Sequence, residues 1–133
     1  MTDYSTWYED LAKPSWTPPG STIGLIWTLL YPLIAVAAVA TVVKVVRGDL
    51  GRIVLVPLAI NLAANVAFTP IQFGLRNLPL ATVDIVVVLL TIAWWAVLVW
   101  RPGSQWVSVL LVPYFVWVAT ATVLQISITL ANR

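Results

Sequence analysis

The sequence contains no histidine and no cysteine, and charged residues make up only 9% of its 133 positions. Without histidine, the chain cannot build a Ser-His-Asp triad, a histidine general base or a histidine-ligated metal site. Without cysteine, disulfide scaffolds and cysteine-ligated metal sites are excluded as well. Because soluble domains carry about a quarter charged residues, the seven Lys and Arg and five Asp and Glu also exclude an ordinary soluble domain.

Hydrophobic residues are abundant instead, at 61% of the chain, and the mean hydropathy is +0.96. A helix of about 20 apolar residues crosses the hydrocarbon core of a bilayer. Four apolar segments reach that length, and they run from about 21–46, 53–73, 80–100 and 104–130. We therefore predict an all-α membrane protein, in which one domain over residues 1–133 forms a bundle of four transmembrane helices.

Residues 1–20 are polar, aromatic and rich in proline, so this segment cannot span the membrane, and Pro18-Pro19 prevents a continuous helix there. An even number of spans places both termini on one side. The opposite side carries four basic residues beside Asp49, namely Lys44, Arg47, Arg52 and Arg101. The positive-inside rule then favours a cytoplasmic 44–52 loop, with the chain in a prokaryotic cell membrane.

Two helices carry stripes of polar or aromatic residues at helical spacing. The stripe on the second helix contains Asn61, Asn65, Phe68 and Gln72, and that on the fourth contains Tyr114, Trp117, Ala121 and Leu124. Amide side chains are costly when they face lipid, so the first stripe should face protein, water or a ligand. Each amide could form interhelical hydrogen bonds, whereas the stripe as a whole favours a cavity wall. Trp27 and Tyr31 form a further aromatic pair, at i and i+4.

The eight tryptophans fall into two groups. Tryptophan collects at membrane interfaces. This interpretation suits the residues at or near the Arg101-Pro102 turn, which are Trp94, Trp95, Trp100 and Trp106, and it suits Trp7 less closely. Trp16, Trp27 and Trp117 lie instead among the proline, small and polar residues of the predicted cavity. The helix over 80–100 is the most uniformly apolar, so we expect much of its surface to face lipid.

Asp84, the only acidic residue within any span, permits two interpretations. Its carboxylate is favoured near a helix N-terminus by the helix dipole and could reach the interface. It could equally form a structural hydrogen bond to the N-terminal segment.

Five motifs resemble those of one family. The first two are Trp7-Tyr8-x-x-Leu11-x-Lys13-Pro14-Ser15-Trp16-Thr17-Pro18-Pro19 and Gly24-x-x-Trp27-Thr28-x-x-Tyr31. The others are Asn61-Leu62-x-x-Asn65 with Phe73-Gly74-Leu75-Arg76, Leu80-Ala81-x-x-Asp84, and Pro113-Tyr114-x-x-Trp117 with Ala121-Thr122-x-Leu124. Together they resemble the signature of the TspO/MBR translocator family, the tryptophan-rich sensory proteins, over nearly the whole chain.

The resemblance implies membrane helices around a ligand pocket, with residues 1–20 as a lid in which Pro18 and Pro19 are structural, as is Asp84 at the start of its helix. Family members bind tetrapyrroles such as protoporphyrin IX. By motif position, the pocket residues are Tyr8, Trp16, Trp27, Tyr31, Asn65, Phe68, Trp117, Ala121 and Leu124. The two stripes add Gln72 and Tyr114. The family norm is five helices, one of them before the first motif, and we expect this chain to lack it.

We therefore expect a sensor, regulator or carrier that binds a tetrapyrrole, as a homodimer in the lipid bilayer, with no nucleic-acid partner. No cofactor or metal is required. An alternative is an enzyme that degrades porphyrin in light with Trp27 or Trp117 as electron donor. A third interpretation is a small multidrug exporter, whose mechanism would need a membrane carboxylate and could use only Asp84.

Overall fold

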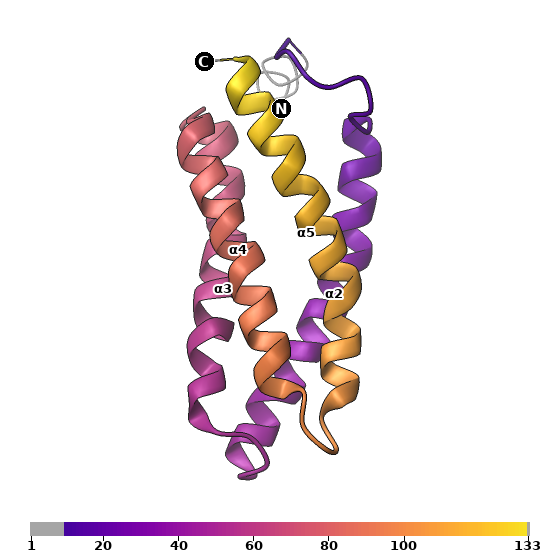
Figure 1. Ribbon diagram of the computed structural model, residues 1–133, viewed down its shortest axis with the longest axis vertical. Coiled ribbons are helices and arrows are strands. Elements are labelled where there is room, and N and C mark those ends of the chain that lie inside the picture. Colours follow the sequence, from indigo (N-terminus) through magenta and orange to yellow (C-terminus); the bar gives the residue numbers. More distant parts are fainter. Residues whose placement is uncertain (1–9, 133) are drawn as a thin grey trace.

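A computed structural model describes residues 10–132, and four long helices account for most of them (Figure 1). The elements are α2 (Gly20–Val46), η1 (Arg52–Val54), α3 (Leu55–Thr69), η2 (Pro70–Gly74), α4 (Leu78–Val99) and α5 (Gln105–Ala131). Four spans are long and apolar enough to cross a membrane. No strand occurs among residues 10–132. The predicted all-α membrane bundle is confirmed.

Local signals set the helix ends close to the predicted positions. The carbonyl of Pro19 accepts hydrogen bonds from the N–H groups of Thr22 and Ile23 and so starts α2. The side chain of Asn77 accepts a bond of 3.0 Å from the N–H of Leu80 and caps α4. Gly48 and Gly103 follow α2 and α4 with φ of +83° and +85°, a conformation that glycine adopts without strain.

The second span is divided into three local geometries rather than one continuous helix. The 3-10 turn η1 leads into α3, and η2 is a π-helical turn that starts at Pro70. Proline has no N–H to donate to the preceding turn, so the helical ladder loosens at this point. The N–H of Leu75 donates to the Pro70 carbonyl over 2.9 Å, which closes the wider turn.

The helix α4 lies between α3 and α5 and packs against both (Figure 1). It buries eight residues, namely Leu78, Ala81, Ile85, Val88, Thr91, Ile92, Trp95 and Val99. The other residues of α4 are exposed or partly buried, and Val83, Leu90 and Val97 are each at least 60% exposed. The expectation that much of this helix faces lipid therefore stays a prediction. A helix that is apolar on every side has no polar face, so its composition does not indicate which side packs against protein.

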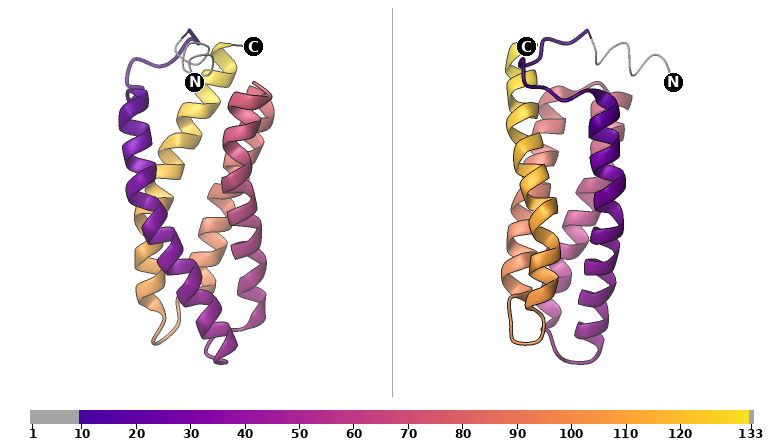
Figure 2. Two further views of the ribbon diagram at one scale, coloured as in Figure 1. Left: turned by 180° about the vertical axis from the view of Figure 1, so that it is seen from behind. Right: turned by 90° about the vertical axis from the view of Figure 1, so that its right-hand side faces the viewer.

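The helix α2 packs mainly against α5 and only slightly against α3. We use the term strap for residues 10–19, which cross the end of the bundle from the last turn of α5 to the start of α2 (Figure 2). The strap contains no helix, as Pro18-Pro19 predicted. Both ends of the described chain therefore lie at the same end of the bundle.

Candidate ligand-binding site

Four aromatic rings from α2 and α5 contact one another between these two helices. The ring of Trp27 stacks on that of Tyr31, with centroids 5.6 Å apart and an interplanar angle of 27°. The same indole meets Tyr114 edge-on at 6.4 Å and Trp117 at 6.3 Å. Each pair of residues is spaced to share one helix face. Two pairs that are far apart in the sequence thus form one aromatic cluster.

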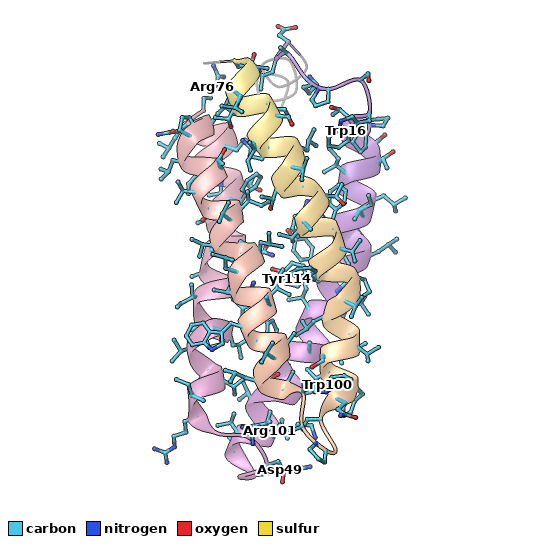
Figure 3. All side chains as sticks on the ribbon, viewed as in Figure 1. Trp16, Asp49, Arg76, Trp100, Arg101 and Tyr114 are labelled. Atoms are coloured by element: carbon cyan, nitrogen blue, oxygen red, sulfur yellow. The ribbon has the colours of Figure 1, made fainter. Side chains whose placement is uncertain are left out.

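This aromatic cluster extends from the core to the surface. Tyr114 is fully buried and Trp117 nearly so, Trp27 is partly buried, and 52% of Tyr31 is exposed. Figure 3 shows Tyr114 at mid-height among the helices. Aromatic faces favour offset stacking and edge contacts with other flat rings. The exposed side of Tyr31 is therefore the edge at which a flat, apolar molecule could extend the stack.

The amide stripe of α3 forms a hydrogen-bonded network with this cluster. Asn65 donates through Nδ2 to the Tyr114 hydroxyl over 2.7 Å, and that hydroxyl donates to Oδ1 of Asn61 over 3.0 Å. Nδ2 of Asn61 donates to the Val88 carbonyl and to the Thr91 hydroxyl. Asn61 is fully buried, so the interhelical interpretation describes it completely.

Asn65 differs from Asn61 because it is only partly buried. Its Oδ1 atom forms no hydrogen bond within the described part of the chain. The Asn65 amide is held in place by Tyr114 at one atom and keeps an acceptor at the other. Asn65 and Gln72 are therefore the two amides of the stripe whose side-chain oxygen has no partner among the described residues.

Three further polar atoms are buried with no hydrogen-bond partner among residues 10–132: Oε1 of Gln72, Oδ2 of Asp84 and Nε1 of Trp117. A buried polar atom without a partner costs free energy. A ligand that supplied a donor or an acceptor at these positions would therefore remove a penalty. One interpretation of Asp84 was a structural hydrogen bond to the N-terminal segment. Oδ2 of Asp84 forms no such bond to any described residue of the strap.

The remaining predicted site residues are distributed around the cluster. Phe68 and Ala121 are partly buried and pack against the hydrophobic core to which Tyr114 and Trp117 belong. Leu124 belongs to a separate apolar cluster with Leu78 and Ile128, against which Leu11 of the strap packs.

The predicted site residues of the strap lie apart from the aromatic cluster. Trp16 is 49% exposed on the strap at the end of the molecule, well away from mid-height Tyr114 (Figure 3). In the same strap Pro18 is partly buried, and Pro19 is exposed at the start of α2. Tyr8 lies outside the described residues.

The interface interpretation of the tryptophans is wrong for Trp95. This side chain is fully buried, and its Nε1 donates to the Thr41 hydroxyl on α2 over 3.0 Å. Its neighbour Trp94 is 40% exposed, and Trp100 and Trp106 are also exposed. Consecutive residues point in directions about 100° apart on a helix, so one tryptophan of the pair can anchor the surface while the other fills the core.

Sequence reasoning missed the contact between Ala12 and Asn132. The backbone N–H of Ala12 donates to Oδ1 of Asn132 over 3.0 Å, and Nδ2 of Asn132 donates to the Ala12 carbonyl over 2.8 Å. No pattern in the sequence indicates this pair, because the residues are 120 positions apart. No group of three or more His, Cys, Asp or Glu side chains that could hold a metal occurs in the described part of the chain.

Comparisons with known proteins agree with the motifs. Residues 1–131 match the sequence profile of the TspO/MBR family. The chain is 40% identical over 131 residues to the Tryptophan-rich protein TspO of Bacillus cereus, and this match covers 96% of the chain and 81% of that protein. It is 35% identical over 118 residues to the Tryptophan-rich sensory protein of Cereibacter sphaeroides, with coverage of 87% and 70%. The Translocator protein of Homo sapiens is 35% identical over 127 residues, with coverage of 90% and 70%.

Proposed function

Because the chain belongs to the TspO/MBR family, we propose that this integral, multi-pass membrane protein binds a tetrapyrrole such as protoporphyrin IX, or a similar hydrophobic molecule, as a sensor, regulator or carrier. The observation that carries the proposal is the aromatic cluster of Trp27, Tyr31, Tyr114 and Trp117, whose rings contact one another between α2 and α5. A porphyrin presents a large flat π-face, and such a face stacks well on indole and phenol rings.

The polar groups around the cluster suit the remainder of such a ligand. Asn65 offers a free amide oxygen next to Tyr114, and Trp117 offers a buried N–H without a partner among residues 10–132. These groups would fix the orientation of the ring, while burial of apolar surface would supply most of the affinity. The chain has no histidine or cysteine and only one methionine, at its first position. The usual axial ligands of haem iron are therefore lacking, and this favours a metal-free porphyrin or a haem held through its ring.

Titration with protoporphyrin IX tests the proposal, with the absorption band of the porphyrin as the readout. Each ring contact contributes about 0.5–1.5 kcal/mol, so Trp27→Phe and Trp117→Phe should each weaken binding by about two- to tenfold. Trp100→Phe is the matched control, because Trp100 is exposed and lies near the end of the bundle away from the strap, below mid-height Tyr114 (Figure 3). The proposal fails if the wild type does not bind porphyrin saturably, or if all three variants bind as the wild type does.

A second candidate function is light-driven degradation of the bound porphyrin. It is supported by the contact between the Trp27 and Trp117 rings, 6.3 Å apart, because neighbouring indoles could deliver electrons to an excited porphyrin. Illumination of the complex in air should then bleach the porphyrin absorption more slowly in Trp27→Phe and Trp117→Phe at equal occupancy. Equal bleaching in these variants and in Trp100→Phe would leave binding alone as the function.

A further inference from the structure

The strap is attached to the far side of the bundle at Leu11 and Ala12. Two hydrogen bonds join the backbone of Ala12 to the side chain of Asn132, the residue that follows the last turn of α5. The adjacent Leu11 packs on the apolar cluster of Leu78, Leu124 and Ile128. Because Nδ2 of Asn132 also donates to the Ile128 carbonyl, its amide is held in the orientation that meets Ala12.

The part of the strap between this attachment and α2 has structure of its own. The N–H and the hydroxyl of Thr17 both donate to the Pro14 carbonyl, over 3.1 Å and 2.7 Å, and so form a tight turn. Pro18 and Pro19 restrict the backbone up to the start of α2. The strap is therefore a stiff connection that is fixed covalently to α2 and by Leu11 and Ala12 to α5 (Figure 2).

The face of α5 that contributes to the aromatic cluster leads directly to this attachment. Trp117, Ala121, Leu124, Ile128 and Asn132 follow one another at intervals of three or four residues, which places them on one side of the helix. Trp117 lies at the inner end of this face, where it contacts Trp27. The outer end is covered by Leu11 and closed by Asn132.

We propose that Asn132 is a positioning residue that latches the strap across this end of the bundle and thereby sets the rate at which a ligand enters and leaves the aromatic cluster. The inference rests on the proposed function, since it assigns an exchange route to the proposed site. Both latch bonds are exposed, so each changes the closed-to-open ratio of the strap by a factor of about two to ten. Loss of both removes the hydrogen bonds of the strap to Asn132 and leaves the packing of Leu11 in place.

Stopped-flow binding and release of protoporphyrin IX by the full chain test the latch. Asn132→Ala should release the porphyrin at least about fivefold faster than the wild type, and Asn132→Asp, which keeps only the acceptor for the Ala12 N–H, should lie between them. Ser127→Ala is the control, because Ser127 lies on the same helix and its hydroxyl donates only within α5, to the Val123 carbonyl. Equal release rates in Asn132→Ala and Ser127→Ala would overturn the proposal.

Hydrogen exchange at the Ala12 amide provides a readout without ligand. The exchange should be faster in Asn132→Ala and unchanged in Ser127→Ala, and equal exchange in both variants would refute the latch. If the wild type does not bind porphyrin, the proposed function is wrong, whereas the exchange at Ala12 still decides whether Asn132 holds the strap.

A reversible covalent lock completes the test, because the sequence has no cysteine and a thiol reagent would therefore react only at two introduced cysteines. In Ala12→Cys/Asn132→Cys, a short bifunctional thiol-reactive reagent that bridges the two thiols through reducible bonds should slow both binding and release of porphyrin, and reductive cleavage of the bridge should restore the rates. Exchange at the uncross-linked rate while the lock is intact would show that ligands do not pass the strap.

Discussion

Tyr114 joins three of the four helices through one side chain. Its hydroxyl accepts from Asn65 and donates to Asn61 on α3, while its ring meets the edge of Trp27 on α2. The residue itself lies on α5 and is fully buried. A phenol at this position can therefore link the amide network to the aromatic cluster, which an aliphatic or purely aromatic side chain could not do.

Removal of this hydroxyl should destabilise the protein. Tyr114→Phe leaves Oδ1 of the fully buried Asn61 without its donor, so we expect a loss of about 1–2 kcal/mol in the free energy of unfolding. Tyr31→Phe is the matched control, because Tyr31 is 52% exposed and its hydroxyl takes no part in the network. Unfolding in mixed detergent micelles measures both variants, and equal stabilities would show that the network adds nothing to the fold.

At the scale of the helices, side-chain hydrogen bonds connect α2, α4 and α5, which are all similarly hydrophobic. Trp95 on α4 donates to Thr41 on α2, and the Ser108 hydroxyl on α5 donates to the Ala96 carbonyl on α4 over 2.6 Å. Lys44 donates to the Gly103 carbonyl over 3.1 Å, which ties the end of α2 to the loop between α4 and α5. Helices in lipid gain little from apolar burial against one another, so such polar contacts and close packing select the arrangement.

The bond between Trp95 and Thr41 permits a direct comparison of two adjacent tryptophans. Trp95→Phe removes this bond and leaves a cavity in the core, so the free energy of unfolding should fall by about 1–3 kcal/mol. Trp94→Phe changes the same residue type on the exposed side of α4 and should have an effect within about 0.5 kcal/mol. A thermal-unfolding series in detergent compares them, and a larger effect at Trp94 would contradict the assignment of Trp95 to the core.

At the scale of the whole molecule, α3 presents a ridge of small residues outward. Ala59 and Ala63 repeat at an interval of four and are exposed, on the side of α3 away from the buried Asn61. Small residues at this spacing allow two membrane helices to approach closely. This outward ridge supports the expectation of a homodimer, which stays a prediction.

A bulky residue on the ridge should prevent such an association. Insertion of a large side chain at a close helix contact costs about 1–3 kcal/mol, so Ala63→Phe should lower the dimer association constant by about tenfold or more. Val39→Phe on α2 is the control, since Val39 is 63% exposed on another helix. Energy transfer between labelled copies in vesicles measures the association, and equal association of the two variants would place any dimer contact elsewhere.

The sequence by itself determined the membrane class, the number of spans in the described chain and the helix ends to within a few residues. These features depend on local properties: an apolar run must be helical in lipid, and Pro19, Asn77, Gly48 and Gly103 act on the backbone next to them. Helical spacing also placed Trp27 beside Tyr31 and Tyr114 beside Trp117 on common faces.

Only the tertiary structure decided which apolar surfaces face protein. Lipid is as apolar as a protein core, so hydropathy does not separate buried Trp95 from exposed Trp94, nor the packed side of α4 from its exposed side. Ala12 and Asn132 are 120 positions apart, and no periodic pattern in a single sequence predicts their contact. The lipid-like composition of the helices thus fixed where the chain crosses the membrane, while packing and a few polar contacts fixed how the crossings meet.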